Sequence, residues 1–336
     1  MKVCLYTENY KQLAKSGLGR AIRHQMKALS LNGIEYTTDL SDDYDVLHIN
    51  TYNIRSFLMA HLKAKEAAIV YHAHSTEEDF RDSFKFSNQI APAFKWWLKQ
   101  CYNLGDVILT PTNYSKQLLE DYGLNPPIYV VSNGIDLSSF KMEKLDKASF
   151  YATYQLNPNQ PVIMGVGLYI KRKGILDFVE LAKRLPHLQF IWFGYTDSFL
   201  ITNDVSEALK TKIPNLQFPG YVDPLKLKEA YQNADLFLFP SYEETEGIVL
   251  LESFAMKLPV LIRDIPIYEE FTDHQVLHKA TNLEEFEQRI HEILNSNIET
   301  MVNQAYEIVK KKDLILIGQQ LIEVYQKALH QKSLRE

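Results

Sequence analysis

The sequence predicts an α/β fold in two domains, and three observations support this prediction. Its 336 residues exceed the usual size of a single domain. Short apolar runs alternate with helical patterns along most of the chain, which is typical of parallel sheets covered by helices. Apolar residues make up 46% and charged residues 23%, so the chain has enough apolar side chains for two buried cores.

The charge of the chain argues against a nucleic-acid partner. The net charge is −6 and the isoelectric point is about 6.0, so bulk attraction to a polyanion is not expected. The acidic excess lies in the second half of the chain. The first 34 residues are instead locally basic, because they contain several lysines and arginines and only one acidic residue, Glu8.

Cysteine usage and hydropathy indicate a cytoplasmic protein. Cys4 and Cys101 lie in apolar surroundings and are interpreted as reduced core thiols. The apolar run at the N-terminus is too short for a signal peptide and is interpreted as a first strand. No stretch approaches the roughly 18 apolar residues of a membrane-spanning helix, which still allows a position on a membrane surface.

The N-terminal domain opens with a strand over residues 2–7, a polar loop and a helix that ends at Asn32-Gly33. The loop contains Gly17 and Gly19, which lack a Cβ and let a ligand approach the backbone closely. Arg20 follows and is a candidate contact for phosphate or acceptor. A simple tight turn is the competing interpretation of the two glycines.

The next strands are expected over residues 45–50 and 68–72, with a helix from about residue 54 to 65 between them. His48 and His72 lie on these strands and are interpreted as core or strand-end histidines. His74 lies just beyond its strand, where parallel sheets place their ligand sites. No cysteine or third histidine is spaced to complete a metal site with His72 and His74, so we expect none.

A helical segment near residues 84–102 interleaves aromatic residues with lysines. Lys95, Trp96, Trp97 and Lys99 suit an anionic membrane interface. A core helix with a solvated lysine face is the competing interpretation. Because adjacent tryptophans cannot share one narrow helix face, we expect at least one of the two to be poorly buried.

The first domain closes after strands expected over residues 107–110 and 128–131, at the turn Asn133-Gly134-Ile135-Asp136. A linker with a small helix is expected over residues 137–160. A strand over residues 161–166 then opens the second domain. It leads to the basic loop Lys171-Arg172-Lys173-Gly174, a plausible diphosphate site at the carboxyl end of a strand.

Further strands are expected over residues 188–193 and 216–222, followed by an acidic loop, Ser241–Gly247, and a helix that carries Glu252. A helix N-terminus offers free N–H groups and a partial positive charge to a phosphate. Carboxylates on either side, Glu244 and Glu252, could accept hydrogen bonds from two sugar rings. Alternatively, the acidic residues only complement the helix dipole.

The segment FLFPSYEETEGIVLLESFAMKLPV, residues 237–260, resembles the signature of the family 4 glycosyltransferases. The shared features are the two glutamates with seven residues between them, the preceding Pro-Ser, and the Gly at the helix start. The resemblance implies the GT-B fold, in which two Rossmann-like α/β domains face a cleft. It places the domains at residues 1–140 and 155–314, with a C-terminal helix over about 315–336 crossing back to the first.

This resemblance also implies roles for the candidate residues around the nucleotide-sugar. Glu244 would bind the transferred sugar and Glu252 the ribose, while His74 would lie beside the reacting sugar carbon. The diphosphate would be neutralised by Lys173 with Arg172. Backbone groups of the following residues would also contact the donor: Gly17, Gly19, Gly220, Tyr221, Val222, Gly247, Ile248 and Val249.

The chain departs from the family pattern at one position. The family carries an arginine after the glycine that corresponds to Gly167, and this chain has Leu168 there. Lys171, Arg172 or Arg20 would then have to supply the missing charge.

The resemblance implies a retaining, metal-independent transfer of galactose or glucose from a UDP-sugar, with no cofactor. The strings SGLGRAIRHQ, HINTYN and VYHAHSTEEDF are similar to Gram-positive enzymes that add a second sugar to glucosyl-diacylglycerol, an anchor lipid of lipoteichoic acid. The implied acceptor is a glycolipid at the inner face of an anionic membrane. A soluble or polysaccharide acceptor, a nucleotide-sugar 2-epimerase and a non-catalytic partner subunit are the alternatives.

Overall fold

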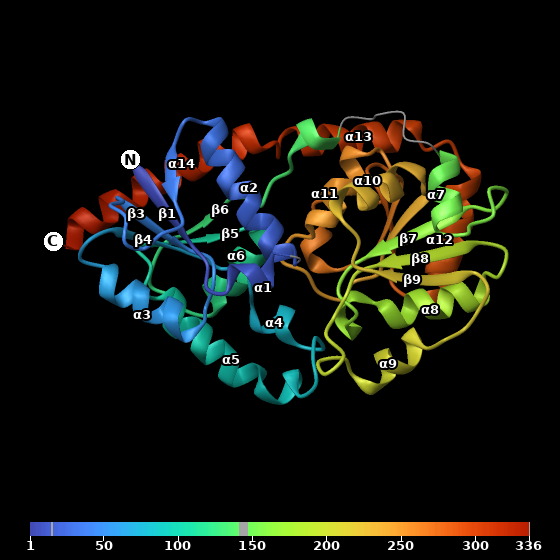
Figure 1. The fold of residues 1–336 in the computed structure, drawn as a ribbon, viewed down its shortest axis with the longest axis horizontal. Helices are drawn as coiled ribbons and strands as arrows, with labels where there is room; N and C mark the ends of the chain where they lie inside the picture. Colours follow the sequence, from blue (N-terminus) through green and yellow to red (C-terminus); the bar gives the residue numbers. More distant parts are fainter. Residues whose placement is uncertain (15, 141–146, 336) are drawn as a thin grey trace. The chain divides into compact units, whose positions relative to one another are not determined.

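The computed structural model describes the whole chain except residues 15, 141–146 and 336, so part of the expected linker lies outside the described residues. The chain divides into two compact units. The first comprises Met1–Phe80, Gln89–Asp136 and Lys311–Glu336, and the second comprises Arg81–Asn88 and Leu137–Lys310. Each unit is built on its own parallel six-stranded sheet with helices on both faces (Figure 1).

The sheet of the first unit has the strand order β2-β1-β3-β4-β5-β6, and each adjacent pair is parallel. The bounds of its strands are β1 Lys2–Tyr6, β2 Glu35–Thr37, β3 Val46–Ile49, β4 Ala68–His72, β5 Val107–Thr110 and β6 Ile128–Val130. The bounds of its helices are α1 Tyr10–Leu13, α2 Gly17–Leu31, α3 Ile54–Lys63, α4 Glu77–Phe80, α5 Ser87–Tyr102, α6 Asn113–Asp121 and α14 Leu314–Arg335.

Alternate residues of these strands enter two separate apolar cores. Val3 and Leu5 of β1 pack toward α2 and the C-terminal helix α14. Cys4 and Tyr6 of the same strand pack on the opposite face, toward α3, α5 and α6. Both cysteines are buried free thiols, as the sequence predicts.

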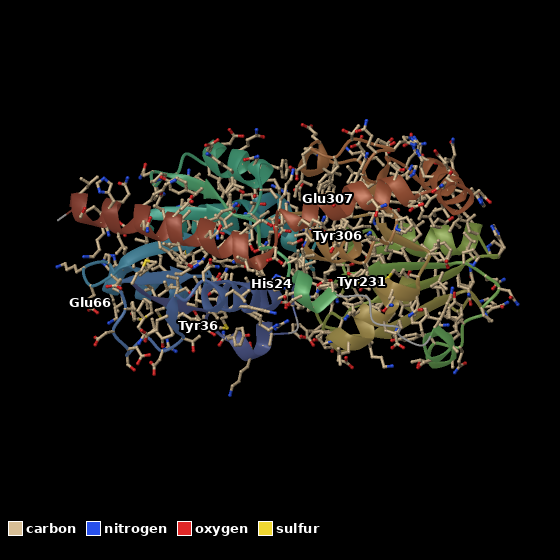
Figure 2. All side chains as sticks on the ribbon, turned by 90° about the horizontal axis from the view of Figure 1, so that it is seen from above. His24, Tyr36, Glu66, Tyr231, Tyr306 and Glu307 are labelled. Carbon is tan, nitrogen blue, oxygen red and sulfur yellow. The ribbon has the colours of Figure 1, made fainter. Side chains whose placement is uncertain are left out.

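The Asn-Gly turn at the end of the first unit is held by α2. His24 of α2, labelled in Figure 2, places its Nδ1 within 3.1 Å of the Asn133 carbonyl oxygen and 2.9 Å of the Gly134 carbonyl oxygen. Lys27, one turn along the helix, forms an ion pair with Asp136. Ile135 then pairs with Asp313, just before α14 begins. The turn therefore joins the two ends of the first unit.

The second sheet has the strand order β12-β11-β10-β7-β8-β9, again parallel throughout. The bounds of its strands are β7 Val162–Val166, β8 Gln189–Phe193, β9 Leu216–Gly220, β10 Leu236–Phe239, β11 Val260–Arg263 and β12 His278–Ala280. The bounds of its helices are α7 Lys147–Thr153, α8 Ile175–Arg184, α9 Asn203–Leu209, α10 Pro224–Asn233, α11 Ile248–Ala255, α12 Leu283–Asn295 and α13 Glu299–Lys310.

Aromatic packing fixes α8 and α10 on opposite faces of this sheet. The Phe178 ring of α8 meets the rings of Phe190 and Trp192 edge-on, with centroid distances of 5.3 and 5.0 Å. Tyr231 of α10 contacts Phe237 of β10, whose neighbours Leu236 and Leu238 face the α8 side instead. The loops that carry the candidate residues of this unit follow the carboxyl ends of β7, β9 and β10.

The strand predicted over residues 216–222 is too long, because β9 ends at Gly220. Gly220 has a φ of 83°, a left-handed conformation that interrupts an extended strand. Tyr221 and Val222 consequently lie in the loop before α10. In the described part of the chain, no helix combines the length and the apolar character needed to cross a bilayer.

Candidate functional site

The basic loop after β7 folds as a single turn, Lys171–Lys173, closed by Gly174. Gly174 has a φ of 75°, and a Cβ at this position would lie 2.2 Å from the Pro240 carbonyl oxygen. Only glycine satisfies both conditions. The basic loop is therefore pressed against the carboxyl end of β10, where the acidic loop begins.

This close approach brings the half-buried Lys173 and the buried Glu244 together as an ion pair. The Lys173 Nζ also lies 5.5 Å from the centroid of the Phe239 ring. The predicted diphosphate cation and the predicted sugar-binding carboxylate thus occupy one place in the fold. An ion pair with a buried partner is costly to desolvate, and it can separate when a ligand offers each partner a better contact.

Arg172 is placed differently from Lys173. Its guanidinium is buried, with Nε donating to the Ser83 hydroxyl at 3.0 Å and Nη1 donating to the Glu243 carbonyl oxygen at 2.6 Å. The bond to Glu243 connects Arg172 to the backbone of the acidic loop. Lys171 is more exposed and lies 4.0 Å from Asp204. Lys173 is the cation of this loop that meets Glu244.

The acidic loop ends at Gly247, which precedes the first residue of α11 and has a φ of 81°. A Cβ there would approach the Tyr268 hydroxyl to 2.9 Å. The N–H groups of Ile248 and Val249 in the first turn have no acceptors within the helix itself. Such N–H groups at a helix N-terminus carry a partial positive charge.

Glu252 lies on α11 and is buried. Tyr231 of α10 donates its hydroxyl to Glu252 Oε2 at 3.0 Å (Tyr231 is labelled in Figure 2). This partner was not predicted from the sequence, because nothing in the spacing of the two residues links them. The bond orients the carboxylate of Glu252 on α11.

Tyr268 is a second residue that the sequence did not reveal. Its ring is buried, and among the described residues its hydroxyl has no hydrogen-bond partner. Burial, followed by the charges of Glu244, Glu246 and Glu243, raises the pKa of Tyr268 well above its ordinary value. The hydroxyl therefore stays protonated beside the acidic loop and can donate a hydrogen bond.

The predicted base-reading segment is only partly available. The carbonyl oxygen of Gly220 accepts a hydrogen bond from the Gly194 N–H at 3.0 Å. The side chain of Tyr221 is exposed and that of Val222 is half-buried. The Gly220 carbonyl is thus already engaged by the neighbouring loop, whereas the Tyr221 side chain reaches the surface.

The two glycines of the first unit have different surroundings. A Cβ on Gly19 would lie 2.2 Å from the Leu13 carbonyl oxygen, so close packing of α1 on α2 accounts for this glycine. A Cβ on Gly17 would meet no described atom within 4 Å. Ser16 caps the helix by accepting a hydrogen bond from the Gly19 N–H at 3.2 Å, and Arg20 follows in the first turn.

The half-buried His74 belongs to a polar chain at the carboxyl ends of β3 and β4. Its Nε2 lies 2.9 Å from Asn50 Oδ1, which also accepts a hydrogen bond from Gln25 at 2.8 Å. Its ring stacks on that of His72 at a centroid distance of 3.8 Å. His72 in turn contacts His48, so three imidazoles from two adjacent strands form one cluster.

These imidazoles are neutral at physiological pH. Burial lowers the pKa of His74 to about 3, and burial followed by the charge of His74 lowers the pKa of His48 to about 3. Burial, then His74 and His48, holds the pKa of His72 well below its usual value. The His74 ring is therefore a neutral hydrogen-bonding group, not a cation.

The aromatic and basic residues of α5 divide into two kinds. Trp96 is 61% exposed, as expected for one of two adjacent tryptophans. Trp97 instead donates its indole N–H to the Tyr52 carbonyl oxygen at 2.6 Å and packs on Phe57. Lys95 lies 3.3 Å from Glu77 and over the Tyr122 ring, whereas Lys99 is half-buried. Trp97 and Lys95 thus serve the packing of the unit.

An exposed apolar stripe on α3 was missed by the sequence analysis. Ile54, Leu58 and Leu62 are 71%, 47% and 61% exposed, and their spacing of four residues places them on one helix face. The contact between Phe57 and Trp97 sets α3 beside α5, as Figure 1 also shows. Ile90 and Trp96 of the neighbouring α5 are also exposed.

Comparison with known proteins places the chain in a family. Residues 146–312 match the glycosyl transferases group 1, and residues 16–139 match glycosyltransferase family 4. The chain is 42% identical to the processive diacylglycerol alpha-glucosyltransferase of Acholeplasma laidlawii over 98% of its own length and 99% of that protein. It is 26% identical to the alpha-galactosylglucosyldiacylglycerol synthase of Streptococcus pneumoniae, covering 77% of this chain and 71% of that one.

Solved structures agree on the fold. Anabaena HepE in complex with UDP and glucose aligns over 97% of this chain and 99% of its own, with a TM-score of 0.76 at 15% identity. The sucrose-phosphate synthase of Thermosynechococcus elongatus aligns over 97% and 98%, with a TM-score of 0.80 at 16% identity. Together the two sheets and these likenesses define a glycosyltransferase of the GT-B fold. The chain belongs to glycosyltransferase family 4.

Proposed function

We propose that this enzyme transfers a hexose from a UDP-sugar to a diacylglycerol glycolipid, with retention of the anomeric configuration. The observation that carries the proposal is the 42% identity, over nearly the whole chain, to an enzyme named as a processive diacylglycerol alpha-glucosyltransferase. UDP-glucose and UDP-galactose are α-linked, so an α-linked product corresponds to retention. The name of this relative supports glucose as the transferred hexose.

In the proposed reaction the second unit supplies the electrostatic stabilisation. As the bond from the sugar to the diphosphate breaks, negative charge grows on the departing UDP. Lys173 leaves Glu244 to meet that charge, and the N–H groups of Ile248 and Val249 add the positive end of α11. Because these groups neutralise the diphosphate, we propose that the transfer needs no metal ion.

The freed carboxylate of Glu244 then accepts hydrogen bonds from hydroxyls of the transferred sugar. Glu252, held by Tyr231, accepts hydrogen bonds from the ribose of UDP. We propose that the neutral ring of His74 hydrogen-bonds a sugar hydroxyl, an arrangement that its buried environment favours. Gly17 and Arg20, at the start of α2, are proposed to contact the phosphate or the acceptor.

We propose further that the enzyme works as a peripheral protein on the inner face of the cell membrane. Exposed apolar side chains on two adjacent helices support this proposal: Ile54, Leu58 and Leu62 on α3, and Ile90 and Trp96 on α5. Arg55, Lys63, Lys65 and Lys99 lie on or next to the same two helices. Apolar side chains with interspersed cations are typical of surfaces that enter the headgroup region of anionic bilayers.

The experiment that tests the proposed function is release of UDP from UDP-glucose and UDP-galactose, with and without glycolipid in anionic liposomes. We expect release that requires both one donor and a diacylglycerol glycolipid, and that continues in EDTA. Release with the donor alone, or with a soluble saccharide, would retain the glycosyltransferase and overturn the lipid acceptor. Absence of turnover with both UDP-sugars would overturn the proposed donor.

A further inference from the structure

A turn of the second unit, well separated in sequence from the donor-binding residues, brings three potential metal ligands together. Asp273, His274 and His278 each offer one ligand atom, and these atoms all lie within 4.8 Å of one another. The turn is closed by a backbone hydrogen bond from His274 N–H to the Leu277 carbonyl oxygen at 2.9 Å. His278 is the first residue of β12, so a strand end anchors one side of the group.

The Asp273 carboxylate is oriented before any ligand binds. Its Oδ1 accepts hydrogen bonds from the backbone N–H groups of His274 and Lys279, at 3.0 and 2.9 Å. Its Oδ2 points to the side chains of His274, with Nε2 at 3.4 Å, and of Arg289, with Nη2 at 3.6 Å. One oxygen is thus fixed by the backbone, and the other faces the group.

Glu292 of α12 orients the His274 ring. Its Oε1 lies 3.3 Å from His274 Nδ1. A histidine that binds a metal through one nitrogen commonly donates its other N–H to a carboxylate in this way. With Nδ1–H directed at Glu292, the lone pair of Nε2 is directed at the side of Asp273.

His278 combines burial with an unsatisfied ring nitrogen. Its side chain is buried, with 5% of the residue exposed, and its Nδ1 has no hydrogen-bond partner in the part of the chain that the structure describes. A buried polar atom without a partner is unfavourable and calls for a ligand. The His278 ring lies 4.6 Å from the His274 ring, centroid to centroid, so both rings belong to one group.

We propose that Asp273, His274 and His278 bind a divalent transition metal of the Zn²⁺ class. Two imidazole nitrogens and one carboxylate oxygen suit Zn²⁺ and not Mg²⁺ or Ca²⁺, which prefer oxygen ligands. Arg289 donates to Glu292 at 2.7 Å and offsets one of the two carboxylates. With neutral histidines, the carboxylates and Arg289 leave a net local charge of −1, which attracts a cation.

A protonated His274 held between Asp273 and Glu292 is the competing account of these contacts. It explains both short distances from the His274 ring but leaves His278 Nδ1 without a partner. A bound metal satisfies both histidines. It would also tie the turn to β12, through His278, and to α12, through Glu292.

The test is direct binding of Zn²⁺ to the chelator-treated chain without a histidine tag, measured by titration calorimetry. Co²⁺ provides a visible absorption band as a second probe. We expect a single zinc ion per chain and a higher unfolding temperature when it binds. His274→Ala changes an exposed residue and should therefore fold, yet it should weaken binding by more than the roughly 10-fold loss seen when a residue that only orients a metal ligand is changed.

The matched control is His187→Ala with His291→Ala. These two histidines also stack in the second unit, at a centroid distance of 5.5 Å, but lie outside the proposed site. The control should bind zinc as the unmodified chain does. Glu292→Gln, which keeps the shape of the side chain, should weaken binding about 10-fold. Equal zinc affinity in the unmodified chain and in His274→Ala, or no binding in either, would overturn the proposal.

Discussion

The ion pair between Lys173 and Glu244 shows how much of the proposed chemistry depends on two side chains. Glu244 is buried and Lys173 is half-buried, and the charge of each offsets that of the other in the ion pair. When UDP-sugar binds, the lysine is proposed to move to the diphosphate and the glutamate to the sugar. The ion pair therefore keeps the two charged groups together, with no net charge, at the proposed donor site.

We predict that Lys173→Ala lowers the turnover number by about 10²- to 10³-fold, the loss typical when one stabilising donor is removed. Lys171→Ala is the matched control, because that cation is more exposed and pairs with Asp204 instead. Release of UDP measures the effect, and circular dichroism verifies that the variant folds. Equal losses in both variants would mean that the whole basic loop, and not Lys173, carries the charge.

At the scale of elements, the parallel strands decide which residues meet. The ends of β3 and β4 carry His48 and His72, and the loops that follow them carry Asn50 and His74. Since adjacent parallel strands end at the same sheet edge, residues distant in the sequence form one buried cluster there. The cluster has no counterpart in any local sequence motif.

This cluster predicts acid sensitivity. A histidine whose pKa is about 3 in the folded chain and about 6.5 in the unfolded chain binds fewer protons when folded between these pH values. The free energy of unfolding should therefore fall as the pH drops below 6.5, by up to about 1.4 kcal/mol per pH unit for each histidine. Urea unfolding of the chain between pH 7 and pH 5 measures this slope.

The control for that slope is His48→Gln, which removes one buried imidazole of the cluster. Its pH dependence should be shallower than that of the unmodified chain by about one histidine's share. An unchanged slope would show that the acid sensitivity arises from other groups.

The basic loop after β7 depends on the close contact between Gly174 and Pro240. Gly174→Ala should lower the free energy of unfolding by more than about 2 kcal/mol, because it combines left-handed backbone strain with a clash against Pro240. Gly220→Ala is the matched control: its φ is 83°, but an added Cβ meets no described atom within 4 Å. It should cost about 1 kcal/mol. Equal losses in urea unfolding would contradict the role assigned to the Pro240 contact.

At the scale of the whole molecule, the surfaces of the helices distinguish packing from association. Most helices bury their apolar residues in one of the cores, but α3 leaves a stripe of large apolar side chains exposed. Contiguous exposed apolar surface of this kind marks an association site. We propose that this surface enters the membrane.

We predict that Leu58→Glu with Leu62→Glu abolishes flotation of the chain with anionic liposomes at low salt. The two changes place negative charge on the surface that is proposed to enter the bilayer. Leu225→Glu is the control, since Leu225 is exposed on α10 of the second unit. UDP release with the lipid acceptor should fall in the double variant only. Flotation that survives both changes would place membrane binding elsewhere on the chain.

The class of fold and the main ligand-binding candidates were predictable from the amino-acid sequence alone. Strand and helix periodicities are local, and residues 237–260 carry a motif whose parts lie close together in the chain. For that reason the elements, the surroundings of both cysteines and the family were predictable. Element ends were less so: β9 stops at Gly220 because of a backbone conformation that its apolar pattern does not encode.

Which side chains meet depends on how the elements pack in three dimensions. Tyr231 reaches Glu252 and Arg172 reaches Ser83 across long stretches of sequence, and Asp273 joins His278 through a closed turn. These contacts depend on where strands end and how helices pack, which no spacing rule specifies. The same reason explains why Arg172 and Lys173, adjacent in the sequence, have different partners. The buried guanidinium of Arg172 binds the Glu243 carbonyl oxygen, whereas Lys173 forms an ion pair with the Glu244 carboxylate.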